Sequence, residues 1–293
     1  MNNYIHIVYC PFTGVGLLGY RGDKWFKNRI EIFSDYTLKS LSNQTDQNFV
    51  LWLSFRPEEE TNPLMITLEL SLKLAGLPYI MTFDGLMYHD DKFSPGLTAR
   101  TVNAARVMRR CWRLGVWSEL IPSLRDIVND KNKTLLGRLR RSLTKFPSHW
   151  SRANLIYLTR VDSDDMLDTN YIEYTHSVSD VPDVFVCKTG TVYNTTTQEL
   201  AEWNPSTNPP FHTIVFTGQS FFDPALHLGR YGSFKSHEDI LKIFQRQTMM
   251  PSHSYCVTTH DPRNHISTIW NHPFRGIIYE KEWAKLFIKN FGL

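Results

Sequence analysis

The chain has 293 residues, of which 42% are hydrophobic, and a formal net charge of +3. No apolar run is long enough to cross a bilayer, and the polar N-terminus lacks a signal-peptide core, so we expect a cytoplasmic protein with one large core. The four cysteines share wide spacing and form no CxxC pair: Cys10, Cys111, Cys187 and Cys256. This spacing favours reduced buried thiols over a zinc site or a disulfide framework.

Strand and helix patterns alternate in the first part of the chain. A strand is predicted at 4–9 and leads to Pro11. Residues 29–49 predict an amphipathic helix and a polar turn before a second strand. A third strand is predicted at 78–83 and ends at Asp84. This alternation predicts a mostly parallel sheet, whose strand carboxyl ends form the ligand crevice.

Residues 100–152 hold most of the positive charge. They contain thirteen Lys and Arg against three acidic residues, a net +10, so the remainder carries −7. We interpret the segment as a helical insertion whose solvent-exposed face is basic. Attachment to an anionic membrane near a lipid-linked acceptor remains an alternative. Nucleic-acid binding is not favoured, because no recognition motif accompanies the charge.

The most informative stretch joins an apolar run at 155–161, which predicts a buried strand, to four polar residues: Asp162, Ser163, Asp164 and Asp165. Three carboxylates this close raise one another's pKa unless a cation compensates them. Oxygen ligands at the end of a strand suit Mg²⁺ or Mn²⁺, in the place where α/β folds bind nucleotides. We therefore expect Pro11, Asp84 and this acidic cluster to converge.

The acidic cluster has three other interpretations. An EF-hand loop that starts at Asp162 reaches Glu173 at its twelfth position, but Met166 and Leu167 stand where a ligand and a glycine are needed. The cluster also matches the DDxxD motif of terpene synthases. That motif needs a helical setting, whereas a strand is predicted before the cluster. A solvated acidic turn could instead cap a helix that starts near Asp168.

The second half predicts a smaller mixed sheet. Strands near 184–188 and 190–194 are typical of such a sheet. The second half also predicts a helix at about 170–177, a stiff segment at 208–211 that leads into a strand at 213–217, a helix that opens at 236–240, and a strand at 254–259. Ser236 is a good N-cap, and the acids after it favour the helix dipole, so a purely structural role explains that helix start. His260 follows the last strand, where a lone histidine is usually a surface or capping residue.

Four stretches, in this order, resemble one family: RIEIFSDYTLKSLSNQTDQNFVLWL, TRVDSDDML, NPPFHTIVF and THDPRNHIST. They are similar to the "putative rhamnosyltransferases", GT-A fold glycosyltransferases related to glycosyltransferase family 2. The resemblance extends from about Tyr4 to about Trp270 and is weakest between Thr61 and Arg152. It implies a GT-A fold, a nucleoside-diphosphate sugar donor, a divalent metal (Mg²⁺ or Mn²⁺) on the diphosphate, and transfer of a sugar such as rhamnose to a hydroxyl of a glycan or glycolipid.

The resemblance also implies donor and metal contacts. Asp164 would bind the metal directly, and Asp162, next to Ser163, would bridge metal and ribose. Asp84 would contact the base. Pro11 stands in the donor loop where the family shows an arginine.

Arginines near the crevice are natural partners of a diphosphate, because a guanidinium pairs bidentately with phosphate. Arg160 has alternate strand spacing with Asp162, so both point to one face. Arg29 and Arg21 follow the first strand. A salt-bridged structural arginine is the other interpretation of each.

An inverting transfer needs a base opposite the leaving diphosphate. The resemblance assigns this role to Asp239, with Glu238 or His237 as substitutes. It also assigns a third metal ligand to His260, with His265 as the alternative, because the turn after His260 is longer than the family's.

We expect one GT-A domain over 1–293, with a nucleotide-binding half at about 1–99, the basic insertion at about 100–152, and a metal and acceptor half at about 153–293. Segment 100–152 could hold the protein at the inner face of a membrane. One alternative is a nucleotidyltransferase. Such an enzyme normally has a glycine-rich, basic loop after the first strand, and here Gly14, Gly16 and Gly19 are present without the expected Arg and Lys pattern. Another is a non-catalytic carbohydrate-binding protein, suggested by 13% aromatic content and eight Trp.

Overall fold

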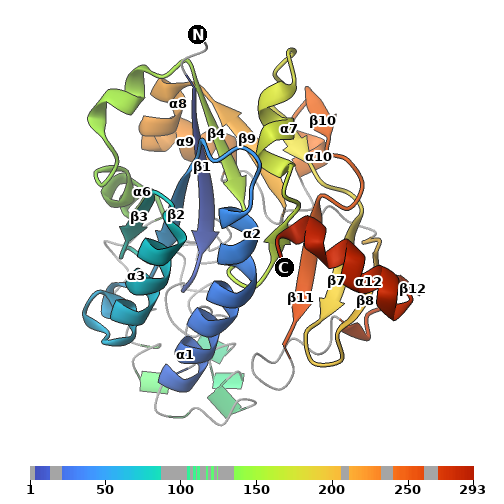
Figure 1. Ribbon diagram of the computed structural model, residues 1–293. Coiled ribbons are helices and arrows are strands. Elements are labelled where there is room, and N and C mark those ends of the chain that lie inside the picture. The colour runs from blue at the N-terminus through green and yellow to red at the C-terminus, as the bar shows by residue number, and fades with distance from the viewer. Residues whose placement is uncertain are drawn as a thin grey trace.

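The computed structural model describes residues 4–13, 22–86, 135–205, 211–231, 240–260 and 270–293, with isolated residues between 104 and 124. The described chain forms a seven-stranded sheet of order β10-β6-β9-β4-β1-β2-β3 and a five-stranded sheet of order β12-β8-β7-β11-β5 (Figure 1). The mixed α/β fold expected from the sequence, with a mostly parallel main sheet and a smaller mixed sheet, is confirmed.

The strands are β1 (Tyr4–Pro11), β2 (Val50–Ser54), β3 (Tyr79–Thr82), β4 (Leu155–Arg160), β5 (Met166–Leu167), β6 (Val184–Val186), β7 (Gly190–Asn194), β8 (Glu199–Trp203), β9 (His212–Phe216), β10 (Gln247–Met249), β11 (Tyr255–Thr259) and β12 (Arg275–Ile278). The α-helices are α1 (Asp23–Ile32), α2 (Leu38–Ser42), α3 (Leu64–Ala75), α6 (Leu135–Leu143), α7 (Tyr171–Ser177), α8 (Gly218–Phe222), α9 (Pro224–Tyr231), α10 (Ile240–Ile243) and α12 (Lys281–Phe287). Short 3₁₀ turns lie at Pro57–Thr61, Ser148–Arg152 and Ile288–Phe291, and a π-helical turn lies at Phe33–Thr37.

The centre of the main sheet is β1, which pairs in parallel with β2 and β4. Its side chains alternate between the two faces, as strand geometry requires. Val8 and Cys10 pack in the cluster that also contains side chains of α1, α2 and α3, whereas Ile7 and Tyr9 pack in the cluster with side chains of α6, α8 and α10. Helices therefore cover both faces, and a strand buried on both sides reads as a nearly continuous apolar run.

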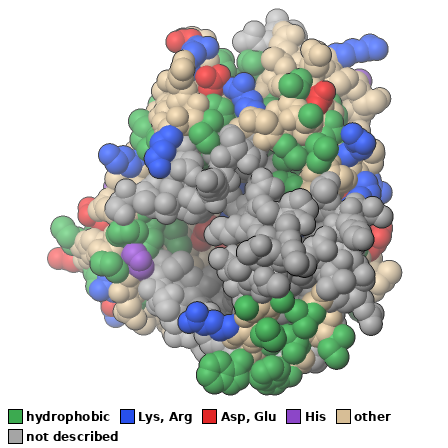
Figure 2. Space-filling view, turned by 180° about the vertical axis from the view of Figure 1, so that it is seen from behind, with side chains coloured by type: hydrophobic (Ala, Val, Ile, Leu, Met, Phe, Trp, Pro, Cys, Tyr) green, Lys and Arg blue, Asp and Glu red, His purple; other side chains and the backbone are tan. Residues whose placement is uncertain are grey.

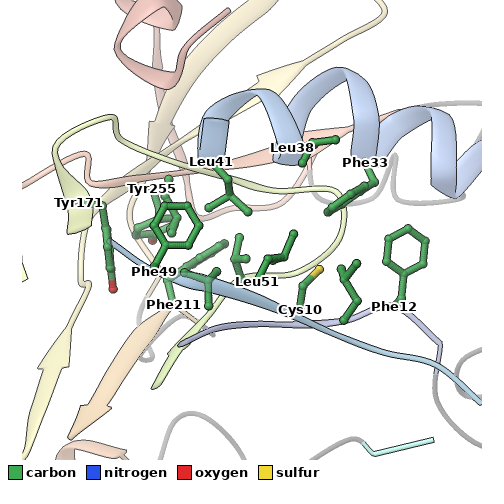
Figure 3. Packing of buried hydrophobic residues seen from close by; sticks show 14 of the residues in the cluster. Cys10, Phe12, Phe33, Leu38, Leu41, Phe49, Leu51, Tyr171, Phe211 and Tyr255 are labelled. Carbon is green, nitrogen blue, oxygen red and sulfur yellow. The ribbon is translucent and has the colours of Figure 1, made fainter. Parts of the chain in front are cut away.

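The helix after β1 starts earlier than the sequence pattern predicts, at Asp23, and continues through the π-helical turn to Ser42. Its buried side chains point toward the strands beneath it, and Phe33, Leu38 and Leu41 lie over this part of the sheet (Figure 3). Burying one large apolar side chain stabilises a fold by about 1.5–3 kcal/mol. This packing therefore holds the helix firmly against the sheet.

One predicted strand lies in a different sheet from the one expected. Residues near 184–188 were assigned to the small sheet, but β6 pairs with β9 and β10 in the main sheet. The next strand, β7, does lie in the small sheet, between β8 and β11. The chain crosses from one sheet to the other at 187–189, and two close strands of similar pattern give no local sign of that crossing.

The described end of the basic segment is α6 and the 3₁₀ turn after it. Arg138 is 4% exposed, so it does not lie on the basic, solvent-exposed face that the sequence predicts. Its neighbours Arg140 and Arg141 are exposed. Most of residues 100–134 lie outside the described part of the chain.

Seen from behind, hydrophobic side chains gather at the lower end of the molecule (Figure 2). Within the described residues, no helix is both long and apolar enough to cross a membrane. All four cysteines are buried and free, as the sequence predicts.

Candidate functional site

The acidic turn lies where the two sheets meet. The amide of Val161 donates to the Tyr9 carbonyl at 3.1 Å, which extends the pairing of β4 with β1 by one residue. The amide of Asp165 then donates to the Asp162 carbonyl at 3.1 Å and closes a turn. The chain continues at once into β5, which pairs with β11 of the small sheet. The turn therefore lies at the carboxyl end of a buried parallel strand, the usual ligand position of α/β sheets.

Two arginines pair with this turn. Arg29 of α1 forms an ion pair with Asp164 through Nη1 and Oδ2, and the two side chains are 14% and 6% exposed. Arg160 Nη2 lies 3.0 Å from Asp162 Oδ1, so both side chains point to one face, as their spacing predicts. The ring of Trp25 lies 5.3 Å from Arg29 Cζ and steadies the guanidinium from α1.

The carboxylates remain under electrostatic strain despite these arginines. Burial raises the pKa of Asp164, against the opposing effect of Arg29. Burial and the neighbouring carboxylates of Asp164 and Asp162 raise the pKa of Asp165 well above its usual value. Among the described residues, the turn has three carboxyl groups and forms ion pairs with two arginines, so a further positive charge would be stabilised here.

The chemistry of this donor set fits a hard divalent cation. Asp162 is 33% exposed on its side chain, so one carboxylate of the turn meets solvent. Two carboxylates, diphosphate oxygens and water would complete the oxygen shell that Mg²⁺ or Mn²⁺ prefers. In the described part of the chain, no group of three or more His, Cys, Asp or Glu residues could hold a metal by itself. Asp162, Asp164 and His260 therefore do not form a ready three-ligand site, and the metal stays a prediction.

The small sheet supports the turn from the other side. Thr258 of β11 donates its amide to Asp165 Oδ1 at 3.0 Å and its hydroxyl to the Asp164 carbonyl. His260 is fully buried, with Nε2 next to the Thr258 hydroxyl and Nδ1 3.0 Å from Thr195 Oγ1. The ring of Tyr36, from the π-helical turn, lies 4.9 Å from the His260 ring.

The other predicted donor contacts lie at the end of β1, within the acidic turn and after β3. Pro11 ends β1 and pairs with Ser54 of β2. Ser163 is 1% exposed within the turn. Asp84 follows β3, three strands from β4 in the sheet order. Its carboxylate accepts hydrogen bonds from Arg141 Nε at 2.6 Å and the Ser142 hydroxyl at 3.2 Å. In this structure Asp84 thus anchors α6, and its role in base binding stays a prediction.

Several predicted residues lie outside the described part of the chain: Gly14, Gly16, Gly19, Arg21, His237, Glu238, Asp239 and His265.

Sequence reasoning missed three residues of this site: Trp25, Tyr36 and Thr258. Thr258 contacts the turn itself, Trp25 contacts Arg29, and Tyr36 contacts His260, which lies next to Thr258. No local motif marks them, so only the packing of the two sheets identifies them.

The comparisons with known proteins give a partial family match. Residues 20–67 match the model of the family described as "Putative rhamnosyl transferase". This range contains Arg29 and β2 but not the acidic turn. No curated protein matches the chain.

Solved structures resemble the chain only distantly. TarS residues 1–349 from S. aureus is 12% identical, with a TM-score of 0.36 over 87% of this chain and 60% of that one. The same TarS fragment in complex with UDP is 12% identical, with a TM-score of 0.40 over 98% of this chain and 70% of that one. A 4-diphosphocytidyl-2C-methyl-D-erythritol synthase is 8% identical, with a TM-score of 0.32 over 98% and 97% of the two chains. At these scores the description of the fold rests on the strand order given above.

Proposed function

We propose that this chain is a metal-dependent, inverting glycosyltransferase that moves a sugar from a nucleoside-diphosphate donor to a hydroxyl of a glycan or glycolipid. The observation that carries the proposal is the acidic turn at the end of β4, where Arg29 and Arg160 pair with Asp164 and Asp162. The family match at residues 20–67 supports the class of enzyme and makes a rhamnose donor the first sugar to test.

The two arginines provide the anion-binding part of the site. A guanidinium binds phosphate bidentately, so a donor diphosphate would compete with the carboxylates for Arg29 and Arg160. Both side chains are held near the turn, Arg29 by α1 and Arg160 by β4. Because they are already positioned, they can stabilise charge on the leaving diphosphate without reorganisation at the moment of transfer.

The acidic turn provides the cation-binding part. Asp164 and Asp162 would hold Mg²⁺ or Mn²⁺ once the diphosphate draws the arginines away. The bound ion would act as a Lewis acid on the diphosphate oxygens and stabilise the leaving group. In this proposal Asp239 is the base that takes the proton of the acceptor hydroxyl, with Glu238 beside it.

The exposed apolar side chains of the basic segment, residues 100–152, support a second proposal, which is contact with a membrane surface. Met108, Trp112, Trp117 and Ile121 are 46%, 74%, 55% and 68% exposed. Tryptophans next to arginines favour the interface of an anionic membrane. We include peripheral attachment through residues 100–152 in the proposal, and co-sedimentation with anionic vesicles tests it, with neutral vesicles as the control.

Thermal unfolding with a panel of nucleotides and nucleotide sugars, with and without Mn²⁺, tests the function. UDP is a suitable first ligand, because it is the ligand of one matched structure. Stabilisation that requires both nucleotide and Mn²⁺ supports the proposal, since a ligand that binds only the folded state raises the unfolding temperature.

Two variants make the test specific. Asp164→Asn should lose the Mn²⁺-dependent stabilisation, whereas Asp180→Asn should keep it, because Asp180 is 91% exposed on its side chain and pairs with Arg246. Stabilisation that survives in Asp164→Asn would contradict the metal assignment. No stabilisation by any nucleotide would favour a binding protein over an enzyme.

A further inference from the structure

A relay of hydrogen bonds crosses the main sheet, outside the proposed donor site. It starts at Asp46, in the loop between α2 and β2, whose Oδ2 lies 2.7 Å from Nδ1 of His176 in α7. His176 Nε2 lies 2.9 Å from His6 Nδ1 on β1, and His6 Nε2 lies 2.7 Å from the Thr159 hydroxyl on β4. Beyond Thr159 the relay passes through four side chains, each within hydrogen-bond distance of the next: Thr213, Tyr171, Cys187 and Ser254.

The relay is open to solvent at one end and buried over the rest. The side chains of Asp46 and His176 are 28% and 8% exposed. The members from His6 to Cys187 are at most 1% exposed. Protons therefore exchange between the relay and solvent at the Asp46 end.

The two ends of the relay lie in different joints of the fold. Next to Asp46, Gln44 Nε2 donates to the Asp168 carbonyl and the Thr45 amide donates to the Thr169 carbonyl, both at 2.8 Å. These bonds join the end of α2 to the segment that leads into α7. Cys187, near the buried end, lies where the chain crosses from the main sheet to the small sheet. The relay therefore connects a surface joint with the junction of the two sheets.

The hydrogens available decide the direction of the first bonds. Against the effect of burial, hydrogen bonds from His176 and the Asn48 amide lower the pKa of Asp46. This carboxylate is ionised at neutral pH and can only accept, so His176 Nδ1 carries a hydrogen. When His176 is neutral its Nε2 is bare, and His6 Nδ1 must donate to it. His6 Nε2 is then bare as well and accepts the hydrogen of Thr159.

The same count decides the bonds farther along the relay. Each buried hydroxyl beyond His6 has one hydrogen and, in the described part of the chain, its oxygen contacts only its two neighbours in the relay. Because the hydrogen of Thr159 goes to His6, each later member must donate to the one before it. The donors beyond Thr159 are, in order, Thr213, Tyr171, Cys187 and Ser254.

We propose that this relay is a proton switch, in which one proton taken up by the two histidines reverses every bond from His176 to Cys187. The His6 hydrogen passes from Nδ1 to His176 Nε2, and His6 takes the incoming proton on Nε2. His6 Nε2 then donates to Thr159, and each hydroxyl turns to donate to the next. Tyr171 finally donates to Cys187, so the S–H of Cys187 turns away from Tyr171. This inference does not depend on the proposed function.

The two histidines take up one proton and not two. A second proton would place two N–H groups and two positive charges against each other across 2.9 Å. Burial, and the charge that His176 would carry, lower the pKa of His6 well below its usual value. The first proton belongs to His176, next to the Asp46 carboxylate. The pair should therefore titrate as one unit.

The other titratable groups around the pair belong to β1, β4 and α7. The Tyr4 hydroxyl lies 3.4 Å from His176 Nδ1 and accepts a hydrogen bond from the Asn48 amide group. The Tyr157 ring stacks on His6, and burial raises the pKa of Tyr157, so it stays neutral in this pH range. Glu173 of α7 accepts from the Thr45 hydroxyl at 2.8 Å.

Nitrogen spectra of protein labelled with ¹⁵N histidine test the two states of the pair, and His6→Gln and His176→Gln assign the ring signals. At pH 9 we expect both rings to carry a hydrogen on Nδ1 and a bare Nε2. As pH falls, one proton should bind in a single step, which leaves His6 with a hydrogen on Nε2. A hydrogen on His6 Nε2 at pH 9, uptake of two protons, or no uptake before acid unfolding would each overturn the inference.

The S–H stretch of Cys187 in the infrared spectrum reports the far end of the relay. The Cys187→Ala variant assigns this band by difference. We expect the band to shift over the same pH range in which the histidines take up their proton, because Cys187 then loses Tyr171 as its acceptor. A band that stays fixed while the histidines titrate would overturn the inference.

Variants at Thr213 separate a connected relay from two independent titrations. Thr213→Val replaces the hydroxyl with a methyl group, so the histidines should still titrate while the Cys187 band no longer follows them. Thr213→Ser keeps the hydroxyl and should keep the coupling. If Thr213→Val does not fold, Tyr171→Phe breaks the next bond by removing one oxygen, and the same loss is expected. A Cys187 band that still follows the histidines in the variant without its hydroxyl would overturn the inference.

Discussion

Arg29 and Asp164 form an ion pair that joins α1 to the end of β4. The two residues are 135 positions apart in the numbering, yet both side chains are largely buried at the junction of the two sheets. Arg29 lies within the part of the chain that matches the family model, and Asp164 lies in the acidic turn outside it. The pair therefore connects the two parts of the proposed donor site.

Removing Arg29 should destabilise the fold. Arg29→Gln leaves the buried Asp164 carboxylate without its cation, and breaking a buried pair in this way costs about 3 kcal/mol. Urea unfolding at pH 7 measures the loss in free energy of unfolding. The double variant Arg29→Gln/Asp164→Asn should recover much of it, because no uncompensated charge remains. If the single and double variants are equally unstable, the interaction between Arg29 and Asp164 does not contribute to the free energy of unfolding.

Asp165→Asn should stabilise the protein at neutral pH. The folded-state pKa of Asp165 lies well above its usual value of 3.8, because of burial and the neighbouring carboxylates. As pH rises past 3.8 the unfolded chain releases this proton first, so the folded state loses stability until pH passes the folded-state pKa. An asparagine does not titrate, and its Oδ1 can still accept from the Thr258 amide.

Urea unfolding across pH 4 to 8 compares Asp165→Asn with the wild type and with Asp180→Asn. The first variant should gain stability relative to wild type as pH rises, and the surface variant should not. A constant difference at all pH values would contradict the assignment of a raised pKa to Asp165.

The sequence predicted β4 and the start of the acidic turn well, because the hydrophobic pattern of a buried strand is clear there. The buried run before Asp162 is β4, and its alternate spacing put Arg160 and Asp162 on one face, 3.0 Å apart. A buried parallel strand needs apolar side chains on both faces, and this requirement leaves a clear pattern.

The rest depends on contacts between distant elements. The assignment of β6 to the small sheet was wrong, because two short strands with the same pattern joined different sheets. The two threonine contacts of His260 and the place of Asp84 beside α6 depend on tertiary packing. No residue next to His260 or Asp84 in the sequence indicates those partners.

His227 should make the protein less stable in acid. Burial lowers the pKa of His227 from 6.5 to about 4, although the hydrogen bond to the Phe221 carbonyl opposes this. Above pH 6.5 the ring is neutral in both states. As pH falls toward 4, only the unfolded chain gains the proton, so stability is lost over that range, by about 3 kcal/mol in total.

His227→Asn isolates this contribution. The asparagine amide can still donate to the Phe221 carbonyl but does not titrate over this range. We expect a loss at pH 7 of about 1–2 kcal/mol from poorer packing, and a shallower decline from pH 6.5 to 4 in urea unfolding. A second buried histidine, His6, also has a lowered pKa, so part of the decline should remain. An unchanged slope would contradict the role of His227.

Gly190 allows β7 to pass next to the ring of Tyr255. A β-carbon at this position would lie 2.6 Å from Tyr255 Cε2, and that ring is fixed by stacking on Phe211 with 4.2 Å between centroids. Tyr255 is fully buried, so it has no room to move without disturbing the small sheet. Gly190→Ala should therefore lower the free energy of unfolding by about 2 kcal/mol, the usual cost of an overpacked core.

Gly229→Ala is the matched control, because it makes the same chemical change in open space. Gly229 lies in α9, has no heavy atom within 4 Å of the added carbon, and does not adopt a positive φ. Alanine favours the helix over glycine, so this variant should gain about 0.5–1 kcal/mol. Urea unfolding of both variants at pH 7 gives opposite signs if Tyr255 fixes the approach of β7 to β11. If Gly190→Ala is as stable as the wild type, the ring can move. The packing of β11, which holds Thr258 against the acidic turn, would then be looser than the structure indicates.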